Sequence, residues 1–157
     1  IKDWEDHMTT VFPEVRLKQF LEMRGTDGGP WTNLCALPAF WVGLMYDDDA
    51  LAAASELVAD WSFEEMETLR ADVPATALRT KFRGGNVQDL ALEVLAMSKG
   101  GLARRIRPDG NSADETGFLD PLFEIAQSGV TPADEILALY DGAWNGDVTP
   151  VFEKLSY

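Results

Sequence analysis

The sequence predicts an α+β fold that is mostly α-helical, with a strand near the amino terminus. Residues 16–24 alternate in character, as the residues of a strand with two different faces do. Signals that start and stop helices recur through residues 34–157. The chain has 157 residues, of which 46% are hydrophobic, and this is enough for one domain with a buried core. We therefore expect residues 1–157 to form a single unit, in which residues 1–33 hold the strand and a loop and residues 34–157 are helical.

The amino-terminal part is expected to form a short helix and then the strand. Asp3 can cap a helix that carries Trp4 and Met8 and ends at Pro13. From Arg16 the period changes to two. One face of the strand would carry Leu17, Gln19, Leu21 and Met23, and the other Arg16, Lys18, Phe20, Glu22 and Arg24. The first of these faces is mostly apolar and the second is mostly charged.

A series of helices follows a glycine-rich turn. The apolar segment 34–46 is expected to be a buried helix. The acidic run Asp47–Asp49 suits the start of the next helix, because carboxylates are favoured at a helix N-terminus. Ser62 and Glu65 have the spacing of a capping box, and Pro74 is expected to close the helix that they start.

The second half of the chain carries the same kind of punctuation. Asn86 can cap a long helix, which we expect to break or kink at Gly100–Gly101. Residues 107–117 are polar and rich in turn formers, so they are the most linker-like segment. Thr131 is expected to cap the last long helix, with a proline at its first position.

Composition argues against several classes of partner. The net charge of −14 would repel phosphate backbones and anionic lipid headgroups, so we expect no nucleic acid or membrane partner. The longest apolar run, 34–46, has 13 residues, whereas a bilayer needs about 20 residues of helix. Cys35 is the only cysteine, and the absence of any possible internal disulfide suits a reducing, cytoplasmic setting. The chain begins without Met, which suggests a piece of a longer protein.

Common catalytic signatures are missing from the sequence. It has no GxxxxGK[ST], HExxH or GxSxG motif, and the lone His7 cannot form a catalytic triad or a histidine metal cluster. Any chemistry must therefore use carboxylates, arginines and backbone amides.

The stretch from Glu22 to Arg24 is the main candidate for such chemistry. Side chains two apart on a strand point the same way, so Glu22 and Arg24 would stand side by side, with Lys18 and Arg16 further along the same face. In one interpretation they form a solvated surface ion pair, the commoner case, which contributes little to stability. In the other, Glu22 offers oxygens to Mg²⁺ while Arg24 holds an anionic oxygen of phosphate or carboxylate. The pattern alone leaves both open.

The loop that follows fits either interpretation. Residues 25–30 include three glycines and a proline; glycines let backbone NH groups approach an anion, and they equally form tight turns. Asp27 is a candidate to join a metal site or, more simply, to cap the turn. Trp31 is a candidate to line a nucleotide pocket, although a tryptophan more often packs in a core.

Long segments of the chain resemble a known enzyme family. They are "DWEDHMTTVFPEVRLKQFLEMRGTDGGPW", "LCALPAFWVGLMYD", "DETGFLDPLFEI" and "GVTPADEILALYDGAWNGDVTPVFEKLSY". Together they are similar to the carboxyl-terminal part of glutamate–cysteine ligases of the plant and alphaproteobacterial type. The resemblance covers essentially the whole chain.

The resemblance implies a function and a fold. Enzymes of this family use ATP and Mg²⁺ to phosphorylate the γ-carboxyl of glutamate, and the amine of cysteine then attacks the acyl phosphate, which is the first step towards glutathione. Their active site lies on a glutamine synthetase-like antiparallel sheet. By resemblance, Glu22 is a metal ligand and Arg24 a catalytic contact to the reacting phosphate or substrate carboxylate, while Arg16 and Lys18 help to bind nucleotide or glutamate.

The resemblance also implies that something is missing. The amino-terminal part of the family, with most of its metal-binding carboxylates, has no counterpart here, so we expect the chain alone to be inactive. The compartment would be the cytoplasm, or the plastid for a plant protein. Two alternatives stay open: a ligase that uses another amine acceptor, and a noncatalytic acidic helical module that docks on a partner through the face from Arg16 to Arg24.

Overall fold

The computed structural model describes residues 1–10, 14–26, 28–106 and 114–154. Most of the described chain is helical, and two short antiparallel hairpins complete it, so the mostly helical class is confirmed. In chain order the elements are α1 (Lys2–Thr9), β1 (Val15–Leu17), β2 (Leu21–Met23), α2 (Trp31–Met45), α3 (Asp48–Val58), α4 (Phe63–Thr76), the 3-10 turn η1 (Ala77–Arg79), β3 (Lys81–Phe82), β4 (Gly85–Asn86), α5 (Val87–Arg104), the 3-10 turn η2 (Thr116–Leu119), α6 (Asp120–Ser128), α7 (Pro132–Asp141) and α8 (Val151–Lys154).

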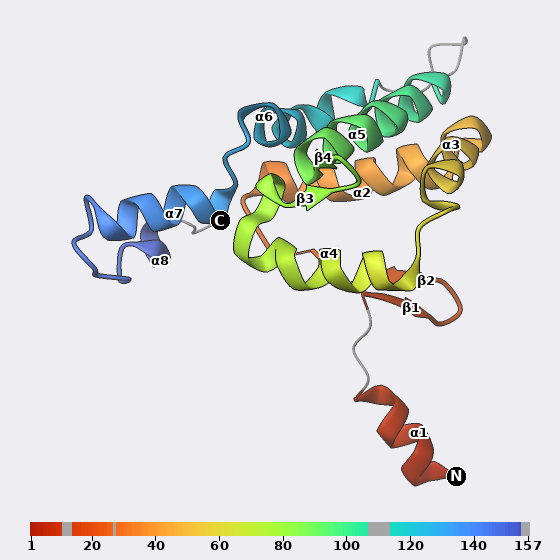
Figure 1. Ribbon diagram of the computed structural model, residues 1–157, viewed down its shortest axis with the longest axis horizontal. Coiled ribbons are helices and arrows are strands. Elements are labelled where there is room, and N and C mark those ends of the chain that lie inside the picture. The colour runs from red at the N-terminus through yellow and green to blue at the C-terminus, as the bar shows by residue number, and fades with distance from the viewer. Residues whose placement is uncertain (11–13, 27, 107–113, 155–157) are drawn as a thin grey trace.

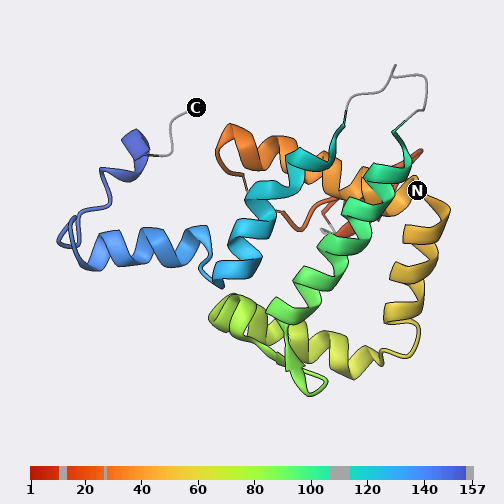
Figure 2. The ribbon, with the colours of Figure 1, turned by 90° about the horizontal axis from the view of Figure 1, so that it is seen from above.

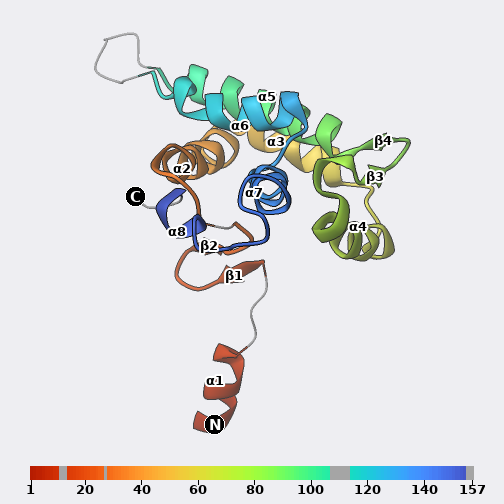
Figure 3. The same cartoon turned by 90° about the vertical axis from the view of Figure 1, so that its left-hand side faces the viewer.

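The helices α2, α5 and α6 form the centre of the molecule (Figure 1). Viewed from the side, α5 and α6 lie above α2 and α4, and the β1–β2 hairpin lies below α2 (Figure 3). The buried apolar cluster joins these layers through Ala39 of α2, Leu102 of α5 and Leu119 of η2. Helices α7 and α8 extend to one side of this centre (Figure 2).

Helix α2 confirms that the apolar segment 34–46 is helical, although the helix begins earlier, at Trp31, and ends at Met45. The expected burial holds for one side of the helix, whereas Tyr46 is 71% exposed. The buried side of α2 includes Ala36, Ala39 and Leu44. Among the helices that the structure describes, none has both the length and the apolar character needed to cross a bilayer.

Helices α2 and α5 approach each other closely where both carry glycine. A Cβ on Gly43 would overlap the backbone and hydroxyl oxygens of Ser98, and a Cβ on Gly101 would overlap the carbonyl oxygen of Gly43. The Ser98 hydroxyl is buried and donates a hydrogen bond to the Phe40 carbonyl at 2.8 Å. The expected break at Gly100–Gly101 is wrong, because α5 continues to Arg104 and Gly101 instead serves the contact between the helices.

Substitution of the two adjacent glycines is expected to have opposite effects. Gly101→Ala should lower the free energy of unfolding by about 1–3 kcal/mol, because the methyl group has no room against α2. Gly100→Ala is the matched control: its Cβ would meet only the flexible Arg104 guanidinium at 3.3 Å, and alanine favours a helix by about 1 kcal/mol. Urea unfolding followed by circular dichroism measures both. Equal stability of the two variants would contradict the close contact.

Three predicted helix caps, those at Ser62, Asn86 and Thr131, are confirmed. The NH of Glu65 donates to the Ser62 hydroxyl at 3.2 Å, and the Ser62 NH donates to the Glu65 carboxylate at 2.8 Å. Asn86 and Thr131 form the same reciprocal boxes with the acidic residues three positions on. Asp47 caps α3 by accepting from the NH of Ala50 at 2.9 Å. The first NH groups of a helix have no partner within the helix, and side-chain oxygens of capping residues accept from them. The sequence therefore predicts where these helices begin.

The Asp47 cap also carries an ion pair between distant segments. Arg104 at the end of α5 donates to Asp47 at 2.6 Å, and this hydrogen bond, together with that from Ala50, lowers the pKa of Asp47 to about 2. Because the folded pKa lies below the ordinary value of 3.8, the stabilisation is present above that value and is lost as the pH falls towards 2.

Arg104→Gln should therefore flatten the loss of stability at low pH. Urea midpoints measured from pH 5 down to pH 2 should fall less in Arg104→Gln than in the wild type, since the variant has less Asp47 stabilisation to lose. Arg105→Gln is the control, because it removes the same charge from the neighbouring residue, which stacks near Tyr46. If both variants give the wild-type slope, the Asp47 contact does not contribute.

Two expected helix limits are wrong. Helix α1 begins at the residue before Asp3, and its N-cap is Ile1, without a side-chain hydrogen bond. Pro74 lies inside α4, which continues to Thr76. The expected end of the first helix at Pro13 lies outside the described residues, as does most of the linker-like segment 107–117.

The continuous strand expected from Arg16 to Arg24 is also wrong. The chain reverses at residues 18–20, and β1 pairs with β2 in antiparallel register, with Arg16 opposite Glu22 and Leu17 opposite Leu21. The sequence does not predict this reversal, because residues 18–20 contain none of the usual turn formers Gly, Pro, Asn or Asp. The assignment of faces holds for the residues that remain in the strands, because residues of equal parity share one face across this register. Lys18, Gln19 and Phe20 lie in the turn instead.

A second hairpin lies where only a loop was expected. Lys81 pairs with Asn86 and Phe82 with Gly85, and both turn residues, Arg83 and Gly84, have positive φ, at 46° and 83°. This is the backbone that a two-residue hairpin turn requires. The Arg83 guanidinium binds Glu65 in α4 at 2.8 Å and Asp60 in the α3–α4 connection at 2.6 Å, so these ion pairs hold Arg83 in an unfavourable backbone conformation.

Candidate functional site

The candidate site is the charged face of the β1–β2 hairpin. The cross-strand register places Arg16 directly opposite Glu22, and Arg24 follows β2 on the same face. The NH of Arg24 donates to the carbonyl of Glu14 at 2.8 Å, which extends the pairing by one more bond. Three of the four predicted site residues are therefore brought together.

Glu22 lies between two guanidinium groups. Its Oε2 accepts from Arg16 Nε at 2.7 Å and from Arg24 Nη1 at 3.5 Å. The side chains of Arg16, Glu22 and Arg24 are 22%, 32% and 27% exposed, so the cluster is half-buried. The predicted neighbourhood of Glu22 and Arg24 is confirmed, but the closer partner is Arg16, which the single-strand interpretation placed further away.

The positive charges around Glu22 keep it ionised. The hydrogen bond from Arg16, and then the charges of Arg16, Arg24 and Lys18, hold the pKa of Glu22 below its ordinary value of 4.5. At neutral pH the cluster is thus one carboxylate among three cations. Such a group suits binding of anionic oxygens and of a metal, and it does not suit proton donation by Glu22.

The fourth predicted residue, Lys18, lies apart from this contact. It sits in the turn between β1 and β2 and is exposed. It acts on Glu22 through its charge, and the structure describes no direct bond between them.

The loop after the hairpin leaves its two interpretations open. Neither Gly25 nor Gly29 has a positive φ, so a left-handed turn does not require glycine at these positions. Trp31 is 73% exposed at the start of α2 and so does not pack in the core of the described chain. Asp27 lies outside the described residues.

A metal would need ligands beyond this cluster. Among the residues that the structure describes, no three His, Cys, Asp or Glu side chains lie close enough together to hold a metal ion. Mg²⁺ in phosphoryl-transfer sites is held by one or two carboxylates together with phosphate oxygens and water. Glu22 fits as one such carboxylate, and it cannot form the site alone.

The sequence is similar to those of known proteins of one family. The sequence profile of the Glutamate-cysteine ligase family 2 (GCS2) matches residues 1–154. The protein named Glutamate–cysteine ligase, chloroplastic, of Arabidopsis thaliana is 55% identical over 155 residues, which are 99% of this chain and 28% of that protein.

Two further relatives are covered to a similar extent. Glutamate–cysteine ligase A, chloroplastic, of Oryza sativa subsp. indica is 54% identical over 157 residues, which are 100% of this chain and 31% of that protein. Glutamate–cysteine ligase, chloroplastic, of Nicotiana tabacum is 51% identical over 157 residues, which are 100% of this chain and 29% of that protein. The chain therefore spans less than a third of the length of these relatives.

Proposed function

Because the chain belongs to the Glutamate-cysteine ligase family 2, we propose that the longer protein of which it forms part joins glutamate to cysteine with ATP. The observation that carries the proposal is the family match over residues 1–154, together with 51–55% identity to relatives named glutamate–cysteine ligase. It confirms the resemblance inferred from the sequence. Since the chain spans less than a third of those relatives, the activity belongs to the longer protein, and the chain alone is expected to be inactive.

The proposed reaction is an ATP-dependent ligation in two steps. The γ-carboxylate of glutamate attacks the terminal phosphorus of ATP, which releases ADP and forms an acyl phosphate. The amine of cysteine then attacks the acyl carbon, loses a proton and displaces phosphate, to give γ-glutamylcysteine on the route to glutathione. Negative charge gathers on the transferred phosphoryl group, so preorganised cations are the main aid that a protein can give.

The hairpin cluster supplies such cations. Arg24 is proposed to bind an oxygen of the transferred phosphoryl group or of the substrate carboxylate, because its planar guanidinium matches such oxygens. Arg16 and Lys18 would assist in binding nucleotide or glutamate. Glu22 would hold the metal as one of its carboxylate ligands while both of its guanidinium contacts fall on Oε2. The chemistry that bound Mg²⁺ supplies is neutralisation of phosphate charge.

The hairpin also favours the proposal of a larger sheet in the longer protein. An isolated two-stranded hairpin is marginally stable in water. Its apolar face is uncovered in the described chain, with Val15, Leu17 and Leu21 exposed by 49%, 79% and 49%. We propose that further strands of the longer protein extend β1 and β2 into a glutamine synthetase-like antiparallel sheet that holds the remaining metal-binding carboxylates.

The decisive assay is ADP release by the intact protein. The proposal expects release that requires glutamate and cysteine together, with a mass-spectrometric product of γ-glutamylcysteine. Omission of either amino acid is the control, and replacement of cysteine by other amines tests whether a different acceptor is preferred. If glutamate and cysteine do not stimulate ADP release, the ligase assignment fails for this protein.

The alternative of a docking module has one observation in its favour, the exposed apolar face of the hairpin. It expects a partner protein bound at that face and no ATP hydrolysis. As for location, the relatives' names place them in the chloroplast, so we propose the plastid for a plant protein and the cytoplasm otherwise.

A further inference from the structure

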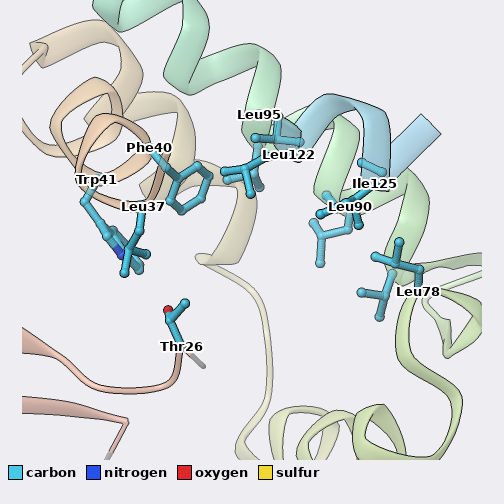
Figure 4. Close-up of a pocket in the computed structure, with 13 residues that line it drawn as sticks. Thr26, Leu37, Phe40, Trp41, Leu78, Leu90, Leu95, Leu122 and Ile125 are labelled. Carbon is cyan, nitrogen blue, oxygen red and sulfur yellow. The ribbon is translucent and has the colours of Figure 1, made fainter. Parts of the chain in front are cut away.

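A large apolar groove runs between helices α2, α5 and α6. It has a volume of about 390 Å³, and we call it the α2–α5–α6 groove. Leu37, Phe40 and Trp41 of α2 line one side, and Leu90 of α5 and Ile125 of α6 lie across from them (Figure 4). Its walls are almost entirely apolar, and this does not suit glutamate, cysteine or the phosphates of a nucleotide.

The groove contains one buried polar group without a partner. The indole nitrogen of Trp41 is inaccessible to solvent and has no hydrogen-bond acceptor among the described residues. An indole N–H can only donate, and a buried donor without an acceptor is costly, so native structures rarely leave one. Because solvent cannot reach this nitrogen, an acceptor that enters the groove cannot reach it either unless the indole moves, so the nitrogen does not identify the occupant.

We propose that a segment of the longer protein preceding residue 1 fills the α2–α5–α6 groove, with apolar side chains against Leu90 and Ile125. The inference rests on the proposed function in so far as it takes the chain to be part of a longer ligase. At least two thirds of the length of the relatives lies outside this chain, so enough protein exists to cover the groove.

The position of the groove supports the same occupant. Thr26 lines it, and Thr26 comes only two residues after Arg24 of the charged cluster (Figure 4). A part of the longer protein that completes the proposed hairpin site would therefore lie close to the groove. A second copy of the chain is a poorer occupant, because two surfaces that each belong to a chain with a net charge of −14 repel each other.

Photo-cross-linking in the intact protein tests the occupant directly. The photoreactive residue benzoylphenylalanine is placed at Leu90 in the groove and, as a control, at Glu93, which is exposed on the same helix. We expect the probe at Leu90 to cross-link to a peptide that precedes residue 1, identified by mass spectrometry, and the probe at Glu93 not to do so. Cross-links from Leu90 to a second copy, only within residues 1–157, or to nothing would each overturn the proposal.

A second variant guards against a probe that disturbs the fold. Ala91 also lines the groove, and Ala91→Phe adds a ring there. If a segment occupies the groove, this ring displaces it, and the melting temperature of the intact protein should fall by about 2–4 °C or more. If the groove is empty, the ring fills it, and an unchanged or raised melting temperature would contradict the proposal.

Neither the cross-link nor the melting temperature depends on the proposed ligation reaction. A cross-link without glutamate- and cysteine-dependent ADP release would support the groove and reject the ligase function. ADP release without the cross-link would do the reverse.

Discussion

Arg24→Ala in the intact protein is expected to lower kcat for ADP release by about 10²–10³-fold, which is the usual loss on removal of one preorganised donor to a developing negative charge. The side chain is half-buried beside Glu22, so the substitution removes a cation from the cluster without opening the core. Circular dichroism and the melting temperature should stay close to those of the wild type. Arg24→Lys should recover only part of the rate, because an ammonium group keeps the charge and loses the planar fork.

A matched arginine serves as the control for this result. Arg79 also forms an ion pair, with Asp134 at 3.2 Å, and its side chain is 60% exposed and belongs to η1. Arg79→Ala should leave kcat within about twofold of the wild type, as expected for a surface pair. Equal and small losses of kcat in both variants would show that Glu22 and Arg24 form an ordinary surface ion pair, which is the first of the two interpretations of the sequence.

The parts of the fold that were predictable are those fixed by nearby residues. The caps at Ser62, Asn86 and Thr131 each depend on a partner three positions away, so the sequence pattern contains the whole interaction. The missed features depend on distant contacts. Gly101 looks like a helix breaker until Gly43 of α2 is placed against it, and no local pattern reveals that neighbour.

In the charged site, too, the features fixed by nearby residues were predictable and those fixed by distant contacts were not. Alternation along residues 16–24 placed Glu22 and Arg24 on one face, because parity along extended backbone is a local property. The closest partner, Arg16, was misplaced because the contact crosses a turn without turn-forming residues. Further metal ligands could not be predicted, since no group of three His, Cys, Asp or Glu side chains lies together in the described chain.

Exposure of large apolar residues was also unpredictable from the chain alone. Trp31 was expected to pack in a core more often than not, and it is 73% exposed. Residue type predicts burial only when the burying surface is present. The chain spans less than a third of the length of its relatives, and in the proposed longer protein the remaining part would supply such a surface for Trp31, the apolar hairpin face and the α2–α5–α6 groove.

Glu22→Gln in the intact protein is expected to raise the Mg²⁺ concentration for half-maximal ADP release by roughly tenfold or more. Loss of groups that merely support metal ligands already weakens metal binding by about 10–100-fold, and a direct ligand should matter at least as much. Glutamine keeps the size of the side chain and an oxygen for Arg16, but it removes the charge. The lowered pKa of Glu22 means that the wild-type residue stays ionised until the pH falls below its ordinary value of 4.5, so assays near neutrality compare a full charge with none.

Glu14→Gln is the matched control for the metal effect. Glu14 lies next to the hairpin and pairs with Arg70 at 2.7 Å, and its backbone carbonyl, which accepts from Arg24, is unchanged by the substitution. The two variants lose the same charge within the same hairpin region, so a general electrostatic effect would shift their Mg²⁺ dependence equally. A shift in Glu22→Gln alone identifies a ligand, whereas equal shifts, or a loss of kcat with unchanged Mg²⁺ dependence, would leave Glu22 the role of positioning Arg16 and Arg24.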